Sequence, residues 1–209
     1  MRLPVSSDYL VAALSDDMRL GDTVLKHHSV GDLLLTTGKL VACDPVVFPE
    51  AEHFDLLLPK GSFPVVLSVA MLGNDQRVAF AIIRFRNTAP VAWDILRVEG
   101  EDSSALKADD YFGYPVDAGI GCFMDAKAGR ELQGLMKKNP NYYEVLSAEM
   151  DKTYVHTWSW LNFKLGDGLQ NIVAFSSGFG DGVYATYAGF DADGEVSVVV
   201  TDFGVVELK

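Results

Sequence analysis

The sequence predicts an α+β fold, in which a mainly antiparallel β-sheet or sandwich carries two or three helices in a single domain. Two observations support this class. Runs rich in β-branched and aromatic residues occupy both halves of the chain, and two helical patterns lie between them without a regular strand–helix alternation. The 209 residues, 49% of them hydrophobic, suffice for a core that needs neither a metal nor a disulfide.

The N-terminal part of the chain differs in pattern from the rest. We expect residues 1–30 to form a helical segment and residues 31–209 to form the single α+β domain. Apolar residues at helical spacing predict a helix over residues 6–20; they are Tyr9, Leu10, Ala13 and Leu14. After Gly31 the pattern becomes that of strands.

Four runs before residue 101 have the composition of strands. They are "LLLTTGKLVACDP", which divides into two short strands around a turn, "GSFPVVLSVAML", "RVAFAIIRFRN" and "VAWDILRVEG". The segment "GNDQ" joins the second run to the third, and "TAP" joins the third to the fourth. Connections this short favour antiparallel hairpins between consecutive strands.

Two helices are expected in the middle of the chain, at about residues 125–137 and 140–150. Asp125 is placed to cap the first helix, and the lysines of its last turn suit the helix dipole. Pro140 would occupy the first position of the second helix, where the missing N–H of proline is tolerated.

Strand patterns resume after the helices. The runs "VHTWSWLNF", "LQNIVAFSS", "GVYATYAGF" and "EVSVVVTDF" each predict one strand. We expect residues 155–202 to form the antiparallel sheet together with residues 63–98. Between the last two runs, "FDADGEV" contains Asp193-Gly194, a dipeptide that predicts a tight hairpin turn with no ligand, and Asp191 belongs to the same turn.

The two cysteines, Cys43 and Cys122, each lie in apolar sequence and are expected to be reduced and mostly buried. A disulfide between them would need an oxidising compartment, and the N-terminus lacks the pattern of a signal peptide. No apolar run approaches the roughly 20 residues of a membrane span. The sequence therefore predicts a cytoplasmic protein with no membrane partner.

The charge of the chain limits its partners. Seventeen basic and 29 acidic residues give a net charge of −12. Nucleic acid is disfavoured as a partner, because affinity for it comes from lysine and arginine on phosphates. The same charge would attract a basic protein and speed its encounter. Nothing in the sequence specifies an oligomeric state.

Glycine and aspartate gather in two further segments. "SSGFGDGVY" places Gly178, Gly180 and Gly182 around Asp181, more glycines than a two-residue turn requires. We expect this loop to pack against residues 117–125, so that Asp181 accepts hydrogen bonds from backbone N–H groups near residues 119–122 or shares a cation with Asp117.

The second segment, "YPVDAGIGCFMD", contains Asp117, Gly119 and Asp125. With Asp181 and Asp202, its carboxylates could form a cluster for a divalent cation, the one cofactor that the sequence allows. The alternative is that Asp125 caps a helix and Asp117 caps a turn.

Aromatic residues suggest a further site. Trp158 and Trp160 alternate in the chain and are expected to share a face with His156, either in the core or in an exposed patch. Tyr184 and Tyr187 add further aromatic side chains in a later run.

Four motifs in order resemble an uncharacterised, mainly bacterial family, the domain of unknown function DUF4241. They are "GKLVACDP", "PKGSFPVVLSV", "YPVDAGIGCFMD" and "FSSGFGDGVYATYAGFDADGEVSVVVTDF". The resemblance covers about residues 30–205. It implies a single domain in which residues 115–125 and 176–191 belong together, and it implies no activity or catalytic residue.

The sequence leaves two candidate functions. The favoured one is a non-catalytic acidic binding protein, an immunity- or antitoxin-like inhibitor of a basic partner, because zinc-ligand spacing and a Gly-x-Ser-x-Gly elbow are both missing. The alternative is a metal-dependent hydrolase using Asp117, Asp125 and Asp181. The binding candidates are Asp117, Gly119, Asp125, Gly180, Asp181, Gly182, Tyr184, Trp158 and Trp160.

Overall fold

The computed structural model describes residues 7–102, 104, 110–166 and 168–206. Within that part of the chain, strands dominate and three helices flank them. In chain order the elements are α1 (Ser7–Ala13), β1 (Met18–Leu20), β2 (Thr23–Leu35), β3 (Leu40–Cys43), β4 (Gly61–Leu72), β5 (Asp75–Arg84), β6 (Ala92–Ile95), β7 (Tyr114–Val116), β8 (Ile120–Asp125), α2 (Ala126–Lys138), α3 (Tyr142–Asp151), β9 (Trp160–Lys164), β10 (Asn171–Ser176), β11 (Gly182–Tyr184), β12 (Thr186–Phe190) and β13 (Val196–Asp202).

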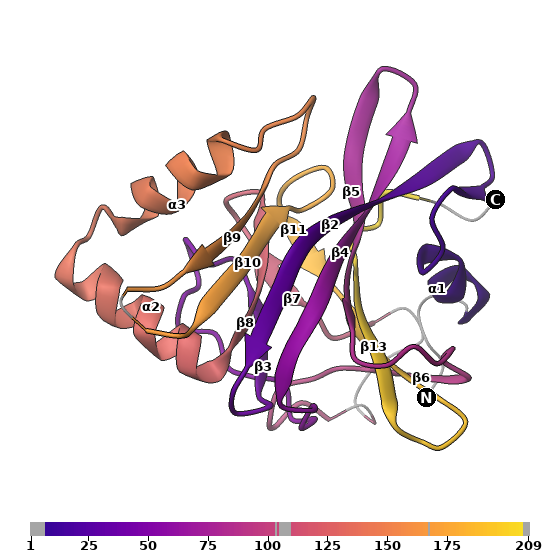
Figure 1. Ribbon diagram of the computed structural model, residues 1–209, viewed down its shortest axis with the longest axis horizontal. Helices are drawn as coiled ribbons and strands as arrows, with labels where there is room; N and C mark the ends of the chain where they lie inside the picture. Colours follow the sequence, from indigo (N-terminus) through magenta and orange to yellow (C-terminus); the bar gives the residue numbers. More distant parts are fainter. Residues whose placement is uncertain (1–6, 103, 105–109, 167, 207–209) are drawn as a thin grey trace.

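The strands form three antiparallel sheets. A seven-stranded sheet has the order β1-β2-β4-β5-β13-β12-β6, a four-stranded sheet has the order β3-β8-β10-β9, and β11 pairs with β7 alone. Figure 1 shows α2 and α3 along the outer side of the four-stranded sheet, with the seven-stranded sheet on its other side. The predicted α+β class is confirmed. None of the described helices is long and apolar enough to cross a membrane.

The central strands of the four-stranded sheet, β8 and β10, are buried on both faces, which fits their nearly continuous apolar sequence. Along β8, Phe123 joins the large core between the sheets, whereas Cys122 and Met124 join a smaller core beneath α2 and α3. Strand β10 alternates in the same way, with Phe175 in the large core and Ala174 in the small one. Successive side chains of a strand point to opposite faces, so each strand contributes to two cores.

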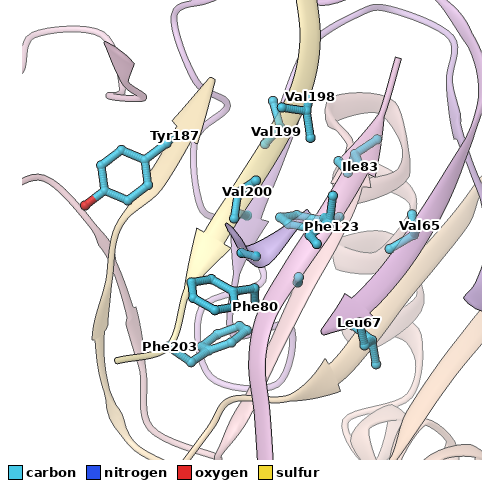
Figure 2. Packing of buried hydrophobic residues seen from close by; sticks show 14 of the residues in the cluster. Val65, Leu67, Phe80, Ile83, Phe123, Tyr187, Val198, Val199, Val200 and Phe203 are labelled. Atoms are coloured by element: carbon cyan, nitrogen blue, oxygen red, sulfur yellow. The ribbon is translucent and has the colours of Figure 1, made fainter. Parts of the chain in front are cut away.

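The large core is rich in aromatic rings. Phe123, Phe175 and Phe203 form an edge-on chain with ring centroids 5.2 and 5.9 Å apart. Figure 2 shows Phe80 beside Phe203, facing the valines of β13. Edge-on pairs add about 0.5–1.5 kcal/mol each beyond the area that they bury, so this chain of rings ties the sheets together.

Helix α2 begins where the sequence predicts. The Asp125 side chain accepts a hydrogen bond from the Lys127 N–H at 2.8 Å and so caps the helix. Helix α3 begins later than expected, at Tyr142, so Pro140 precedes the helix instead of opening it. Asn139, the residue before the proline, is extended as proline requires of its neighbour, and a turn is needed before α3 can start.

The N-terminal helix is shorter than the predicted residues 6–20, of which residue 6 lies outside the described part. The Asp16 carboxylate accepts the N–H groups of Asp17 and His27, and Asp17 has a left-handed φ of 58°. Local side-chain bonds of this kind compete with helix propagation. The chain then enters β1 and β2, so residues 18–20 and 23–30 of the expected helical segment 1–30 are strands of the seven-stranded sheet.

Two predicted strand pairings are wrong. Strands β4 and β5 form the hairpin expected at "GNDQ", but β6 does not pair with β5, because β13 and β12 lie between them. The expected single sheet from residues 63–98 and 155–202 is divided, because β10 pairs with β8 and β9 pairs with β10 in the other sheet. The run "GVYATYAGF" also splits, into β11 and β12 of different sheets.

The hairpin turn at Asp193-Gly194 is confirmed. Gly194 has a φ of 79°, and its N–H donates to the Asp191 carbonyl at 3.0 Å. The Asp191 side chain accepts hydrogen bonds from the Thr88 hydroxyl and from the N–H groups of Asp193 and Glu195. These hydrogen bonds, that from Thr88 above all, lower the pKa of the Asp191 carboxyl.

The two cysteines face each other across β3 and β8, with the sulfur atoms of Cys43 and Cys122 at 3.6 Å and no disulfide between them. Both are fully buried, which confirms the expected burial. The hydrogen bond with Cys122, together with burial, holds the pKa of the Cys43 thiol well above its usual range.

We expect both thiols to be inert in the folded protein, because the reactive species is the thiolate. Titration with an aromatic disulfide reagent should be slow in native protein and complete, at two thiols, in denaturant. Rapid reaction of either native thiol would contradict this expectation.

Candidate functional site

A pocket of about 290 Å³ opens where β11, the start of β12 and the end of β13 meet. Its walls combine three phenol rings with a single carboxylate. The lining residues are Tyr111, Val183, Tyr184, Ala185, Tyr187, Asp202 and Gly204. The volume is near the lower end of the roughly 300–1,000 Å³ typical of small-molecule sites.

Asp202, the last residue of β13, carries the charge of the pocket. Its Oδ1 accepts the Gly204 N–H at 2.8 Å and lies 3.5 Å from the Tyr9 hydroxyl. Burial raises the pKa of Asp202 to about 6, although these two donors favour the charged form. At pH 7 the carboxylate is therefore mostly ionised in a poorly hydrated position. Such a group strongly attracts a cation that enters the pocket.

Tyr187 forms the deep wall of the pocket and is 1% exposed. Burial, and next the charge of Asp202, raise the pKa of the Tyr187 phenol well above its usual value. Figure 2 shows its hydroxyl turned away from Phe80 and Phe203. The ring is thus fixed by the core while its polar end stays outside the aromatic cluster.

The glycine-rich loop positions Tyr184, the opposite wall. The Tyr184 hydroxyl donates to the Gly180 carbonyl at 2.7 Å, and its ring packs edge-on against Phe203 at 4.9 Å. A Cβ on Gly182 would lie 2.9 Å from the Tyr184 ring, and a Cβ on Gly178, where φ is 59°, would lie 2.8 Å from a methyl group of Val205. These two glycines make room for the ring and for the tight packing of the loop.

The loop also contacts residues 117–125, as the sequence predicts. The Ser177 N–H donates to the Gly119 carbonyl at 3.1 Å, and the Gly119 N–H donates to Asp181 Oδ1 at 3.0 Å. Strand β11 pairs with β7, where Gly182 lies opposite Val116. The loop thereby joins the two glycine- and aspartate-containing segments.

Removing the Asp181 side chain should loosen this junction only slightly. The hydrogen bond to Gly119 is exposed, so water replaces the carboxylate in Asp181→Ala, and we expect a loss of about 0.5–1.5 kcal/mol. Urea denaturation of the variant, compared with wild type, measures this directly. A loss above about 3 kcal/mol would show that the Gly119 N–H is left without any partner.

A comparison with protein families covers both the glycine-rich loop and residues 117–125. A family model described as "Protein of unknown function (DUF4241)" matches residues 33–201, which is most of the chain. The chain belongs to this family. No curated protein and no solved structure matches it.

In this DUF4241 protein the three predicted metal-binding aspartates do not come together. Asp117 and Asp181 lie on adjoining segments, but Asp125 is at the far end of β8, a strand that spans roughly 15–20 Å. Its oxygens accept the N–H groups of Thr37 and Lys127. Among the residues that the structure describes, no group of three His, Cys, Asp or Glu side chains is placed to hold a metal ion.

In this DUF4241 protein Trp158 and Trp160 pack in or against the large core. Trp158 is 6% exposed and donates its indole N–H to Gln76 at 3.2 Å, and Trp160 is partly buried. The His28 ring contacts both indoles, at centroid distances of 5.1 and 5.5 Å. His156 lies in a turn with a φ of 57° and does not share their face. Neither indole is available as an exposed anchor at the pocket.

Sequence reasoning identified Tyr184 but missed the pocket that it lines. Tyr111 comes from a segment with no strand pattern, and Asp202 was considered only as a member of a metal cluster. One signal was present for Asp202, because a charged residue ends the otherwise uncharged, buried strand β13. Charged residues at such positions are costly and therefore informative.

Proposed function

We propose that this protein is a non-catalytic binding protein for a basic partner protein, of the immunity or antitoxin kind. The observation that carries the proposal is the ionisable carboxylate of Asp202 within a pocket walled by tyrosines. The net charge of −12 acts in the same direction at longer range, because it attracts a basic partner before contact.

The rim of the pocket has the composition of a binding surface. Tyr111 is 43% exposed and Val183 is 50% exposed, and both line the opening. Tyrosine is enriched in interface hot spots, because it buries a large rigid area at a small cost in side-chain entropy. The lining groups are phenols, a carboxylate and aliphatic side chains, which suit binding better than the nucleophile-and-base pairs of catalysis.

We place this binding in the cytoplasm. Cys43 and Cys122 are buried in apolar surroundings, which is typical of structural, reduced cysteines in cytoplasmic proteins. An antitoxin-like protein would meet its partner there.

Affinity capture tests the proposal. The chain is immobilised, an extract of its own organism is passed over it, and the captured protein is identified, purified and titrated calorimetrically. We expect a partner with a pI above about 9, bound more weakly as salt rises. The Asp202→Asn variant should bind it at least about tenfold more weakly, and Asp193→Asn, which removes the same charge from an exposed turn, should bind within about twofold. Recovery of no basic protein, or equal binding by Asp202→Asn, would overturn the proposal.

A further inference from the structure

We infer that the pocket binds the ammonium group of a single lysine side chain presented by the partner. This inference rests on the proposed function and adds the chemistry of the group that is recognised. Three features of the pocket carry it: the arrangement of its acceptors, the state of its phenol groups and its size.

The carboxylate offers one oxygen to a ligand. Both hydrogen bonds of Asp202, from Gly204 and from Tyr9, fall on Oδ1. Among the described residues no hydrogen bond is made to Oδ2, and Asp202 lines the pocket. A guanidinium pairs best with two carboxylate oxygens at once, whereas an ammonium is a compact charge that a single oxygen satisfies. The acceptor geometry therefore favours lysine over arginine.

Two of the three tyrosines direct their hydroxyl hydrogens to backbone carbonyls. Tyr184 donates to the Gly180 carbonyl, and Tyr111 donates to the Val183 carbonyl at 3.1 Å. An anionic ligand would thus meet a carboxylate and two engaged hydroxyl groups. A cation would meet aromatic rings, whose faces attract positive charge.

The size and the rim of the pocket fit one side chain. About 290 Å³ is small for a cofactor or a drug-sized ligand. The exposed Val183 and Tyr111 at the opening can cover the methylene groups of a lysine, while its charged end reaches Asp202. A lysine on a protein surface reaches such a pocket without unfolding of either partner.

A blocked lysine, Nα-acetyl-lysine methylamide, is the probe for the test. Titration into the protein at low salt should give saturable shifts of the tyrosine ring signals in NMR spectra, with a Kd of about 1–10 mM for this isolated group. The matched probe with an acetylated ε-amine has similar length and no charge, and it should not bind. The blocked arginine should bind at least about threefold more weakly than the blocked lysine.

Two variants complete the experiment. Asp202→Asn should lose at least about tenfold in affinity for blocked lysine, and Asp193→Asn should not change it. Absence of saturable shifts, tighter binding of the arginine probe, or equal binding by Asp202→Asn would each overturn the inference. If a basic partner binds but blocked lysine does not, only this inference fails; if blocked lysine binds but no basic partner is captured, only the proposed function fails.

Discussion

Replacing Asp202 with asparagine is expected to stabilise the folded protein at pH 8 by about 1–3 kcal/mol. In the wild type, burial raises the pKa of this carboxyl from its ordinary 3.8 to about 6, so the ionised form is destabilised in the folded state. Asparagine has nearly the same shape and can still accept the hydrogen bonds of Gly204 and Tyr9. It carries no charge that must be kept in a poorly hydrated position.

The effect has a defined pH dependence. Because the folded pKa is above the unfolded one, the stabilisation that Asp202 provides is complete below about pH 3.8 and is lost as the pH rises through about 6. The gain from asparagine should therefore be small near pH 4 and complete at pH 8. Urea denaturation of both proteins at these two pH values measures it, with Asp193→Asn as the control for a lost surface charge.

If Asp202→Asn is more stable than wild type and yet binds the basic partner more weakly, the carboxylate serves binding and not folding. Groups that lower stability are kept in proteins where they serve a site, and Asp202 is such a candidate. If Asp202→Asn proves less stable than wild type at pH 8, the carboxylate supports the fold and the argument for a binding role weakens.

Replacing Asp44 with alanine is expected to have the largest destabilising effect, a loss of about 3–5 kcal/mol. Asp44 is fully buried after β3 and accepts four backbone N–H groups at 2.7–3.1 Å. Two of them belong to its own turn, at Val46 and Val47, and two to the segment at Asp117 and Ala118. Without the carboxylate, these donors lose their acceptor together.

The size of the loss can be checked against two matched variants. Asp44→Asn keeps one acceptor oxygen and should lose less than Asp44→Ala. Asp117→Asn alters an exposed side chain of the same junction and should change the free energy of unfolding by less than about 0.5 kcal/mol. Denaturation curves for the three variants give the ranking. Asp44→Ala within about 1 kcal/mol of wild type would show that water satisfies the four donors.

Local signals, formed by residues close together in the sequence, were enough to predict a helix cap, a hairpin turn and a loop contact of this protein. Asp125 caps α2 because a carboxylate before a helical pattern meets its free N–H groups, whatever the rest of the chain does. Asp193-Gly194 turns the chain because only a few residue types tolerate its positive φ. The contact between Asp181 and Gly119 was also predictable, because an excess of glycines indicates close backbone approach.

Tertiary structure decided the pairing of strands and the assembly of the pocket. Backbone hydrogen bonds are the same for any two strands, so the position of β12 between β13 and β6 depends on packing of the whole chain. Tyr111, Tyr184 and Asp202 are far apart in sequence and meet only because β11 and β13 end side by side. The raised pKa of Asp202 has the same origin, since burial is a property of the folded surroundings and not of the residue.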